Sequence, residues 1–485
     1  MKNFKIYKIL VLSALISLSG CQRLEQLQDN PNNPTQISPQ YLLTSIETDA
    51  FNNISLGSAR ASRQLVYVGG IDSDQYYNWT RGSFDDYLKI KNLTKMEEEA
   101  DRMDAPVYKS LAKFLKAYYF IRLSETFGDV PYAEASNPEI KQPKYDDQKA
   151  IYLSVLNNLK AVNEELKTSQ DAIAGDVIYN GDKLRWRKLV NSFTLRVLMD
   201  LSKKESDPDL NIKGRFAEIV NNPAQYPIFE SNEDSAYLRF DNVVGNRYPH
   251  FNNNDMNLVI YLEQSFVSKL KTLKDPRLFS FGEPMANSAG ANPSDKFSYY
   301  DGIYGSGDAG ANSQKAAAGL ASKINSRYYK DPVNEPGMMM GYSEIEFILA
   351  EGALRKWYNG SVDDHYKKAI TASMKFYKIS DASIAEYLAQ PSVQLVSADP
   401  LLQIMTQKHI SFFMNSGWRA FFEQRRTGLP LFNTDGGGAL NGGKIPKRWM
   451  YPDSERQYNT LNLNAAITKQ YSEGDNINAT MWLLK

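Results

Sequence analysis

Apolar residues recur at helical spacing through residues 108–127, YKSLAKFLKAYYFIRLSETF, and no other feature constrains the fold as much. They form two adjacent stripes along one helix, made by Leu111, Leu115 and Tyr118 and by Phe114, Ala117 and Ile121. Because apolar residues nearly surround the middle of this segment, it is predicted to be a central, buried helix. Gly128 and Pro131 are expected to end it.

Further segments show the same period and are separated by loops rich in Gly, Pro and Asn. They cover residues 147–166, 184–201, 256–273, 342–357, 362–377 and 401–413. Helices that follow one another across short turns favour antiparallel pairs stacked as in tetratricopeptide repeats, although no strict repeat of about 34 residues is present. The sequence therefore predicts an all-α fold of tetratricopeptide-like stacked helix pairs with long irregular, ligand-bearing loops.

The chain contains one cysteine, Cys21, and this residue follows a secretory leader. Lys2, Lys5 and Lys8 precede an apolar run at 9–18, which is too short to span a bilayer. The tetrapeptide LSGC that ends at the cysteine resembles the bacterial lipobox, whose cysteine carries diacylglycerol. This resemblance implies cleavage before Cys21 and a lipid anchor on its thiol. The alternative is an ordinary secretory signal that happens to end near a cysteine.

The predicted domain organisation has three parts. Residues 1–20 are a lipoprotein signal peptide, residues 21–40 a lipidated tether, and residues 41–485 a helical body. The tether ends in DNPNNPTQISPQ, whose prolines and asparagines disfavour regular structure.

Several classes of chemistry receive no support from composition. Once Cys21 is assigned to the anchor, no thiol remains for a disulfide, a metal site or a nucleophile. His250, His365 and His409 lie far apart and lack the spacing of metal ligands. The 56 basic and 56 acidic residues leave no formal net charge, which does not favour a nucleic-acid surface. No cofactor, metal or nucleic-acid partner is therefore predicted.

The first candidate ligand site is the segment at 69–87, GGIDSDQYYNWTRGSFDDY. A sugar presents flat C–H faces and hydroxyl groups, so its site needs exposed aromatic rings beside hydrogen-bonding side chains. This segment offers both kinds of group, in Tyr76, Tyr77, Trp79, Asp74, Asn78 and Arg81. The alternative is that the three rings cap the hydrophobic core beneath a loop.

The second candidate site is the segment at 281–314, which is rich in Gly, Ala, Ser and Asn and has no usable period. Loops of this length tend to be functional or disordered, and aromatic residues argue against disorder. Tyr299, Tyr300 and Tyr304 are therefore predicted to supply further stacking rings. The alternative is that this loop contacts a partner protein instead of the ligand.

Other conspicuous residues are interpreted as structural. Glu423, Arg425 and Arg426 resemble a buried ion-pair element that joins helices. Packing is also the default interpretation for three tryptophans on predicted helical faces, Trp186, Trp357 and Trp418.

Five segments, in order, resemble the characteristic motifs of the SusD/RagB outer-membrane lipoproteins of Bacteroidetes. They are AYYFIRLSETFGDVPYAEA at 117–135, RWRKLVNSFTLRVLMDLSK at 185–203, YSEIEFILAEGALR at 342–355, GWRAFFEQRRTGLP at 417–430 and IPKRWMYPDSERQYN at 445–459. The lipobox and the following DNPNNPTQ also fit this family. The segment at 281–314 would correspond to its variable central insertion.

The resemblance implies a protein that binds an oligosaccharide at the outer membrane, faces the cell surface and passes its ligand to a SusC-like TonB-dependent transporter without catalysis. Gln22 and Arg23 directly follow Cys21, whereas surface-exported members carry acidic residues there. Three alternatives stay open: an oligopeptide-binding member of the family, an exported glycoside hydrolase with two carboxylates opposed across a cleft, and a structural helical-repeat scaffold.

Overall fold

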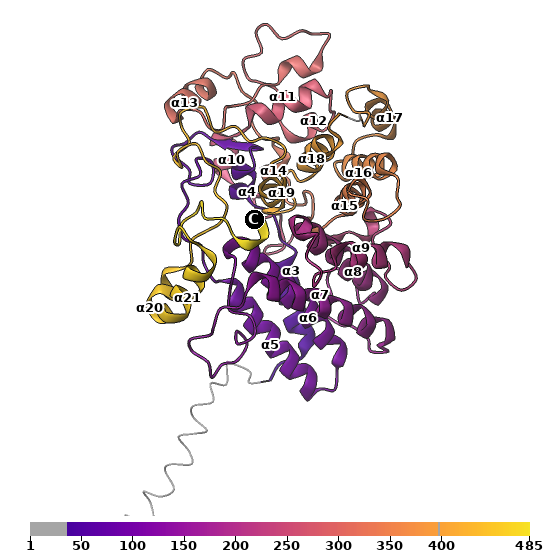
Figure 1. Ribbon diagram of the computed structural model, residues 1–485. Coiled ribbons are helices and arrows are strands. Elements are labelled where there is room, and N and C mark those ends of the chain that lie inside the picture. The colour runs from indigo at the N-terminus through magenta and orange to yellow at the C-terminus, as the bar shows by residue number, and fades with distance from the viewer. Residues whose placement is uncertain (1–35, 396–397) are drawn as a thin grey trace, which may run out of the picture.

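The computed structural model describes residues 36–395 and 398–485, so the leader, Cys21 and the tether up to residue 35 lie outside the described residues. Helices dominate the described chain (Figure 1) and its strands are short, which confirms the all-α prediction. No helix within these two ranges is long and apolar enough to cross a membrane.

Consecutive helices packed on one another form the first half of the body. They are α3 (Pro39–Ala50), α5 (Asp86–Arg102), α6 (Pro106–Phe127), α7 (Gln148–Thr168), α8 (Lys183–Asp200) and α9 (Ile212–Asn221). Each of α5 to α8 packs against the next, and α3 lies against α5 (Figure 1). This is the predicted stacking of helix pairs.

A second group of helices follows later in the chain. Its members are α15 (Tyr342–Leu354), α16 (Val362–Phe376), α17 (Asp381–Ala389), α18 (Pro400–Ser411) and α19 (Arg419–Thr427). α15 packs against α16 and α18 and also touches α8 of the first group. Ten of the thirteen residues of α15 are buried, so this helix is the point at which the two groups share a core.

The end of α6 shows why glycine stands at position 128. Helix α6 begins with Pro106 in its first turn, where a proline loses no hydrogen bond, and is buried around most of its circumference as predicted. Gly128 then takes a φ of +95°, a conformation that side chains disfavour. A Cβ atom there would also lie 2.2 Å from the Tyr471 hydroxyl, so the close approach of the C-terminal segment requires glycine as well.

The prediction of one helix over residues 256–273 is wrong. The structure has α10 (Asn254–Val259), then β3 (Ile260–Leu262), then α11 (Gln264–Thr272). β3 pairs antiparallel with β1 (Leu65–Tyr67), and all three of its residues are buried. A short apolar run fits a helix and a buried strand equally well, and the long-range partner decides between them. Glu263 then starts α11, its carboxylate accepting from the backbone N–H of Ser265 at 2.6 Å.

The second two-stranded sheet joins β2 (Ala236–Leu238) to β4 (Gly337–Met340), also antiparallel, with an irregularity in register between Ala236 and Tyr237. The remaining helices are α4 (Leu56–Ala61), α12 (Leu278–Phe281), α13 (Ala309–Ala317), α14 (Arg327–Lys330), α20 (Asp453–Tyr458) and α21 (Thr460–Gln470).

The segment at 281–314 is irregular for most of its length, as predicted. It contains one 3-10 turn (Lys296–Tyr299) and the start of α13. Isolated bridges tie it to the body, among them Glu263 with Ile303 and Gly307 with Gly437.

Buried charges connect α19 to the helices around it. Arg419 forms ion pairs with Glu125 of α6 at 2.8 Å and with Asp200 of α8 at 2.7 Å. Arg426 reaches Glu351 of α15 at 2.6 Å. Glu423 pairs with Lys408 of α18 at 2.7 Å, so the predicted ion-pair element joining helices is confirmed for Glu423 and Arg426. Arg425 forms no ion pair within the described residues and donates instead to the backbone carbonyls of Lys447 and Glu125.

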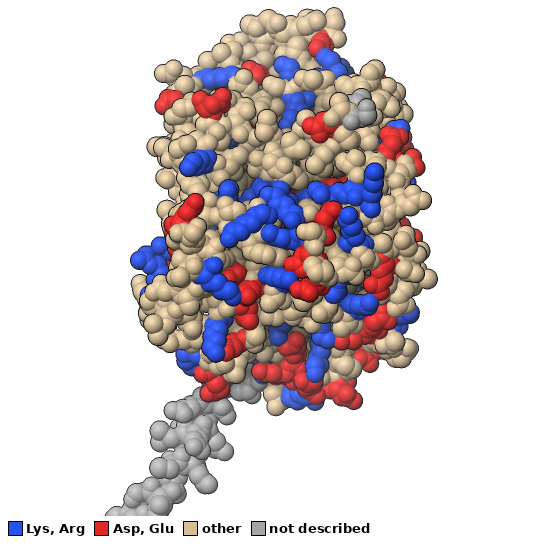
Figure 2. Space-filling model, in the orientation of Figure 1, with Lys and Arg blue, Asp and Glu red and all other residues tan. Residues whose placement is uncertain are grey.

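Charge is unevenly distributed although the chain has no formal net charge. Figure 2 shows Lys and Arg side chains concentrated in a band across the middle of one face, around the place where Figure 1 marks the C-terminus. Lys203 and Lys204 donate to the backbone oxygens of Leu484 and Lys485 there. Burial lowers the pKa of Lys203, and the neighbouring cations Lys447 and Arg426 lower it further.

Candidate functional site

The rings of the first predicted loop are buried. Tyr76, Tyr77 and Trp79 are 1%, 0% and 6% exposed. The Tyr77 hydroxyl donates to the Ala61 carbonyl at 2.9 Å, and the Arg63 guanidinium lies 4.3 Å from the centre of its ring. The Tyr76 hydroxyl is buried without a hydrogen-bond partner among the described residues. Because all three rings are buried within the protein, the prediction that they are exposed for stacking is wrong.

Trp79 belongs to a cluster of aromatic rings. Its indole N–H donates to the Arg448 carbonyl at 3.1 Å, and its ring stacks on Trp449 with centroids 4.6 Å apart and planes 8° apart. Trp418 and Phe421 pack edge-on against it at 5.8 and 5.4 Å. Trp79 is therefore the buried support for Trp449.

The polar residues predicted in the same loop, Asp74, Arg81 and Asn78, do not gather around one site. Burial raises the pKa of Asp74, the nearby Asp72 raises it further and Arg60 opposes both. Arg81 forms ion pairs with Asp453 at 3.0 Å and Asp475 at 2.9 Å, which fasten this loop to the C-terminal segment. Asn78 is exposed.

The three tyrosines of the second predicted loop are not equivalent. Tyr300 is 7% exposed and packs on Phe279 with centroids 5.5 Å apart, so it belongs to the core. Tyr299 and Tyr304 are half-buried. The Tyr304 hydroxyl donates to Asp435, a residue that lies outside both predicted loops in the sequence.

The two predicted loops meet through a third segment, at 433–440. The Leu440 N–H donates to the Tyr76 carbonyl at 2.9 Å, and Gly307 bridges to Gly437. A Cβ atom on Gly438 would lie 2.1 Å from the Gly307 carbonyl oxygen and 2.6 Å from the Tyr76 ring. The run of three glycines at 436–438 was the sequence signal for this close approach, and sequence reasoning missed it.

Tyr304 lines a groove of about 650 Å³ between α11 and α18, which we call the Tyr304 groove. The exposed Leu431 contributes apolar surface to it, and the buried Tyr366 lies at its wall. Lys269 lines it too, and burial lowers the pKa of this lysine to about 8 against the opposing charge of Glu263.

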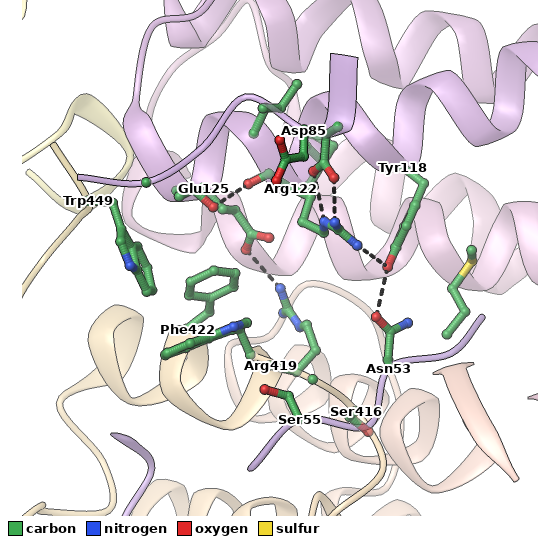
Figure 3. A pocket seen from close by; sticks show the side chains of 18 of the residues that line it. Asn53, Ser55, Asp85, Tyr118, Arg122, Glu125, Ser416, Arg419, Phe422 and Trp449 are labelled. Carbon is green, nitrogen blue, oxygen red and sulfur yellow. Dashed lines mark hydrogen bonds and ion pairs between the residues drawn. The ribbon is translucent and has the colours of Figure 1, made fainter. Parts of the chain in front are cut away.

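A second cleft, of about 380 Å³, lies between α5 and α6 on one side and residues 416–422 with Trp449 on the other (Figure 3). We call it the tryptophan cleft. Trp418 and Trp449 are half-buried at its wall, with their rings perpendicular and 4.8 Å apart. Trp418 belongs to the motif GWRAFF and Trp449 to the motif PKRWMY. Sequence reasoning assigned Trp418 to packing and did not single out Trp449.

Hydrogen-bonding side chains face the tryptophans across this cleft. Arg122 donates through Nε to Asp86 at 2.8 Å, and the Tyr118 hydroxyl donates to Asn53 at 3.2 Å (Figure 3). Asp85 is exposed and accepts from the Ser83 hydroxyl at 2.7 Å. The internal hydrogen bonds hold these groups in fixed positions, so the cleft combines flat apolar faces with preorganised polar groups.

Glu125 is the carboxylate at the base of the tryptophan cleft. Burial raises its pKa to about 7, Arg419 opposes this shift and Asp200 adds to it. The carboxylate accepts from Arg419 at 2.8 Å, inside the buried ion network described above. Glu125 therefore has a structural role in this network. Across the described ranges, no group of three or more His, Cys, Asp or Glu side chains is placed to hold a metal ion.

Comparison with known proteins agrees with this architecture. Residues 31–452 match the SusD-like family described as starch-binding and associating with the outer membrane. A SusD homologue of Bacteroides fragilis is 37% identical, with a TM-score of 0.86 over 93% of this chain and 100% of that one. A second B. fragilis homologue is 31% identical, with the same TM-score and coverage.

An outer-membrane protein of Bacteroides vulgatus with a proposed role in nutrient binding is 35% identical, with a TM-score of 0.87 over 93% of this chain and 100% of that one. No curated protein matches the chain. The family match and these three structures together lead to one conclusion: the chain belongs to the SusD-like family of nutrient-binding outer-membrane proteins.

Proposed function

We propose that this protein is a non-catalytic, lipid-anchored receptor that binds an oligosaccharide in the tryptophan cleft and delivers it to a SusC-like TonB-dependent transporter. The observation that carries the proposal is the pairing of Trp418 and Trp449 with preorganised polar groups across one cleft (Figure 3). Membership of a family described as starch-binding supports a sugar as the ligand.

The chemistry of the cleft suits a sugar. Half-buried indole rings offer flat surface to the C–H face of a pyranose, and their perpendicular arrangement matches a ligand that turns between successive units. Arg122, Asp85 and Asn53 supply both donors and acceptors for hydroxyl groups. A volume of about 380 Å³ lies within the usual range for small-ligand sites.

The Tyr304 groove is the competing position for the ligand. It contains one residue of the predicted ligand set, and Tyr366 stands beside it. Its larger apolar surface and its lysine, Lys269, suit an oligopeptide better than a neutral sugar, because a peptide offers side chains and a carboxylate. The peptide-binding alternative is therefore assigned to this groove.

Affinity electrophoresis with a panel of neutral polysaccharides tests the proposed site. Migration of the wild-type protein should be retarded by at least one polysaccharide, and Trp418→Ala should abolish the retardation. Tyr304→Ala is the matched control, since it removes a half-buried ring from the other groove and should leave retardation intact. The reverse pattern would move the site to the Tyr304 groove, and thermal unfolding of both variants would show whether they fold.

The absence of catalysis has a direct test. Incubation of the protein with each polysaccharide that it binds should leave the chain length unchanged. Shortened products that disappear in Glu125→Gln would instead support a glycoside hydrolase acting through the carboxylate in the cleft.

The anchor and the transporter are tested in the native host. Cys21→Ala should release the protein from the membrane fraction, because no other lipid attachment site is proposed. Protease added to intact cells should degrade the wild-type protein if it faces the surface. A SusC-like transporter should be recovered when the protein is purified in mild detergent, and its absence from such preparations would contradict the proposed delivery step.

A further inference from the structure

A third cavity, of about 860 Å³, has a different character from the two described above. It lies between α16 and the segments that surround the β2–β4 sheet, and we call it the basic groove. Tyr342 and Phe376 are half-buried and contribute aromatic surface, and the buried Tyr237 packs beside Phe376 with ring centroids 5.7 Å apart. Beside the rings stand Asn232, Ser231 and Thr371, which can hydrogen-bond to hydroxyl groups.

Cations outnumber carboxylates along this groove. Its basic residues are Arg239, Lys367, Lys368, Lys375 and Lys378, and its acidic residues are Glu233 and Glu335. Four of the five cations belong to α16 or to the turn that follows it. The chain as a whole has equal numbers of both charges, so this excess is a local feature.

Internal ion pairs neutralise only part of this charge. Lys367 pairs with Asp363 at 2.6 Å and Lys375 with the exposed Asp381 at 3.3 Å. The buried Glu335 pairs with Arg327, outside the set of groove cations. Within the described ranges, Arg239, Lys368 and Lys378 form no ion pair, and all three are exposed.

A smaller cavity continues the groove past α8. It shares Glu233 and Arg239 with the basic groove and adds Arg185 and Lys188. The Arg185 side chain lies over the Tyr179 ring at 4.6 Å and reaches the carbonyl of Glu233, so its charge meets no carboxylate at hydrogen-bond distance. Lys188 pairs with Glu230 and Asp234, and Asp182 also lines this cavity, so Arg185 is the one added cation without a carboxylate partner among the described residues.

We propose that the basic groove binds an acidic oligosaccharide, one that carries carboxylate or sulfate groups along its chain. Aromatic rings beside unpaired cations fit a ligand with flat C–H faces and regularly placed negative charge. A peptide of the same charge would use the cations but leave the hydroxyl-binding groups and rings unmatched. The proposal rests on the proposed function only in taking the ligand to be a sugar, since the residues are different.

Isothermal titration of the lipid-free mature protein provides the test. The probes are tetragalacturonate, a sulfated tetrasaccharide from carrageenan, neutral maltotetraose and a tetra-aspartate peptide. At low salt, at least one acidic sugar should bind more tightly than the neutral sugar and the peptide, and added salt should weaken its binding.

The triple variant Arg239→Gln, Lys368→Gln, Lys378→Gln should weaken binding of the acidic sugar by about tenfold or more, because three attractive charges are lost. The control triple variant Lys91→Gln, Lys356→Gln, Lys444→Gln removes the same charge from exposed positions elsewhere and should change the affinity by less than about twofold.

Three results would overturn the proposal: no binding of either acidic sugar at low salt, an equal loss in the control triple variant, or tighter binding of the tetra-aspartate peptide. Neutral sugars that bind in the tryptophan cleft should be unaffected by the groove variant. Failure at the basic groove is thereby distinguished from failure of the proposed function.

Discussion

Arg426 of α19 and Glu351 of α15 form a two-point ion pair in the interior of the protein, with Nη1–Oε1 and Nη2–Oε2 distances of 2.7 and 2.6 Å. Neither side chain is more than 4% exposed. Since α15 is also the helix that touches both helical groups, this pair fixes α19 against the shared core. The tryptophan cleft takes Arg419 and Phe422 from the same helix, so the pair also positions one wall of the candidate site.

Arg426→Met should lower the free energy of unfolding by about 3 kcal/mol or more. The substitution leaves Glu351 buried with one partner fewer, and an uncompensated buried charge is strongly destabilising. Urea unfolding followed by tryptophan fluorescence measures this. Lys160→Met breaks the exposed pair with Glu218 and should cost about 1 kcal/mol or less. Equal losses in the two variants would contradict the structural importance of the Arg426–Glu351 pair.

Glu47 should make the protein less stable as pH rises. Burial raises the pKa of this carboxyl to about 10, and the charge on Asp176 adds to the shift. Its Oε2 atom accepts from the Val177 N–H at 2.8 Å, whereas its Oε1 atom is buried without a hydrogen-bond partner in the described chain to stabilise a negative charge. A folded pKa above the unfolded value means that the folded state binds more protons, so stability is full below about pH 4.5 and is lost as pH rises toward the folded pKa.

Glu47→Gln removes this titration while keeping the shape of the side chain. The variant should gain stability relative to wild type as pH rises from about 5 to 8, by up to about 1.4 kcal/mol per pH unit. Urea unfolding at several pH values measures the difference. Glu98→Gln alters an exposed carboxyl, so its free energy of unfolding plotted against pH should run parallel to that of wild type. If the free energy of unfolding of Glu47→Gln also ran parallel to that of wild type over this pH range, Glu47 would be ionised in the folded protein.

Gly438→Ala should loosen the junction of the three loops. Its φ is not positive, so the expected effect comes from the added methyl group, which would lie 2.1 Å from the Gly307 carbonyl oxygen. Overpacking of this kind costs about 1–3 kcal/mol. Hydrogen exchange should become faster in residues 304–313 and 435–440. Gly310→Ala, in α13, has more space and should leave exchange unchanged or slower, and faster exchange there would contradict the argument from close approach.

Tyr77→Phe should destabilise the protein without changing its affinity for sugar. Removal of the hydroxyl leaves the buried Ala61 carbonyl without this partner, which costs about 1–3 kcal/mol. Thermal unfolding gives the first quantity and titration with the bound oligosaccharide gives the second. A loss of affinity at unchanged stability would return Tyr77 to the ligand site.

The sequence predicted the helical elements well where the period was long. Helix α6 lies within two residues of its predicted limits, because a segment apolar on nearly all sides can only be buried. It failed over residues 256–273, where Ile260 to Leu262 form a strand. Three apolar residues carry no period, and their strand partner at Leu65–Tyr67 lies almost 200 positions earlier in the chain.

The candidate site was harder to predict than the fold. Sequence identified rings beside polar residues at 69–87, but it could not show that Trp79 lies beneath Trp449 and that Trp449 faces the cleft. Burial of a given ring depends on segments more than 300 residues away in the chain. Position in the fold, and not residue type, separates a supporting tryptophan from a binding one.

Titration calorimetry of one neutral oligosaccharide against wild type, Trp418→Ala and Tyr304→Ala tests the central claim most directly. The account predicts that Trp418→Ala loses measurable binding, that Tyr304→Ala binds as wild type does, and that the oligosaccharide is recovered intact. Unchanged binding by a folded Trp418→Ala variant would contradict the assignment of the tryptophan cleft as the sugar site.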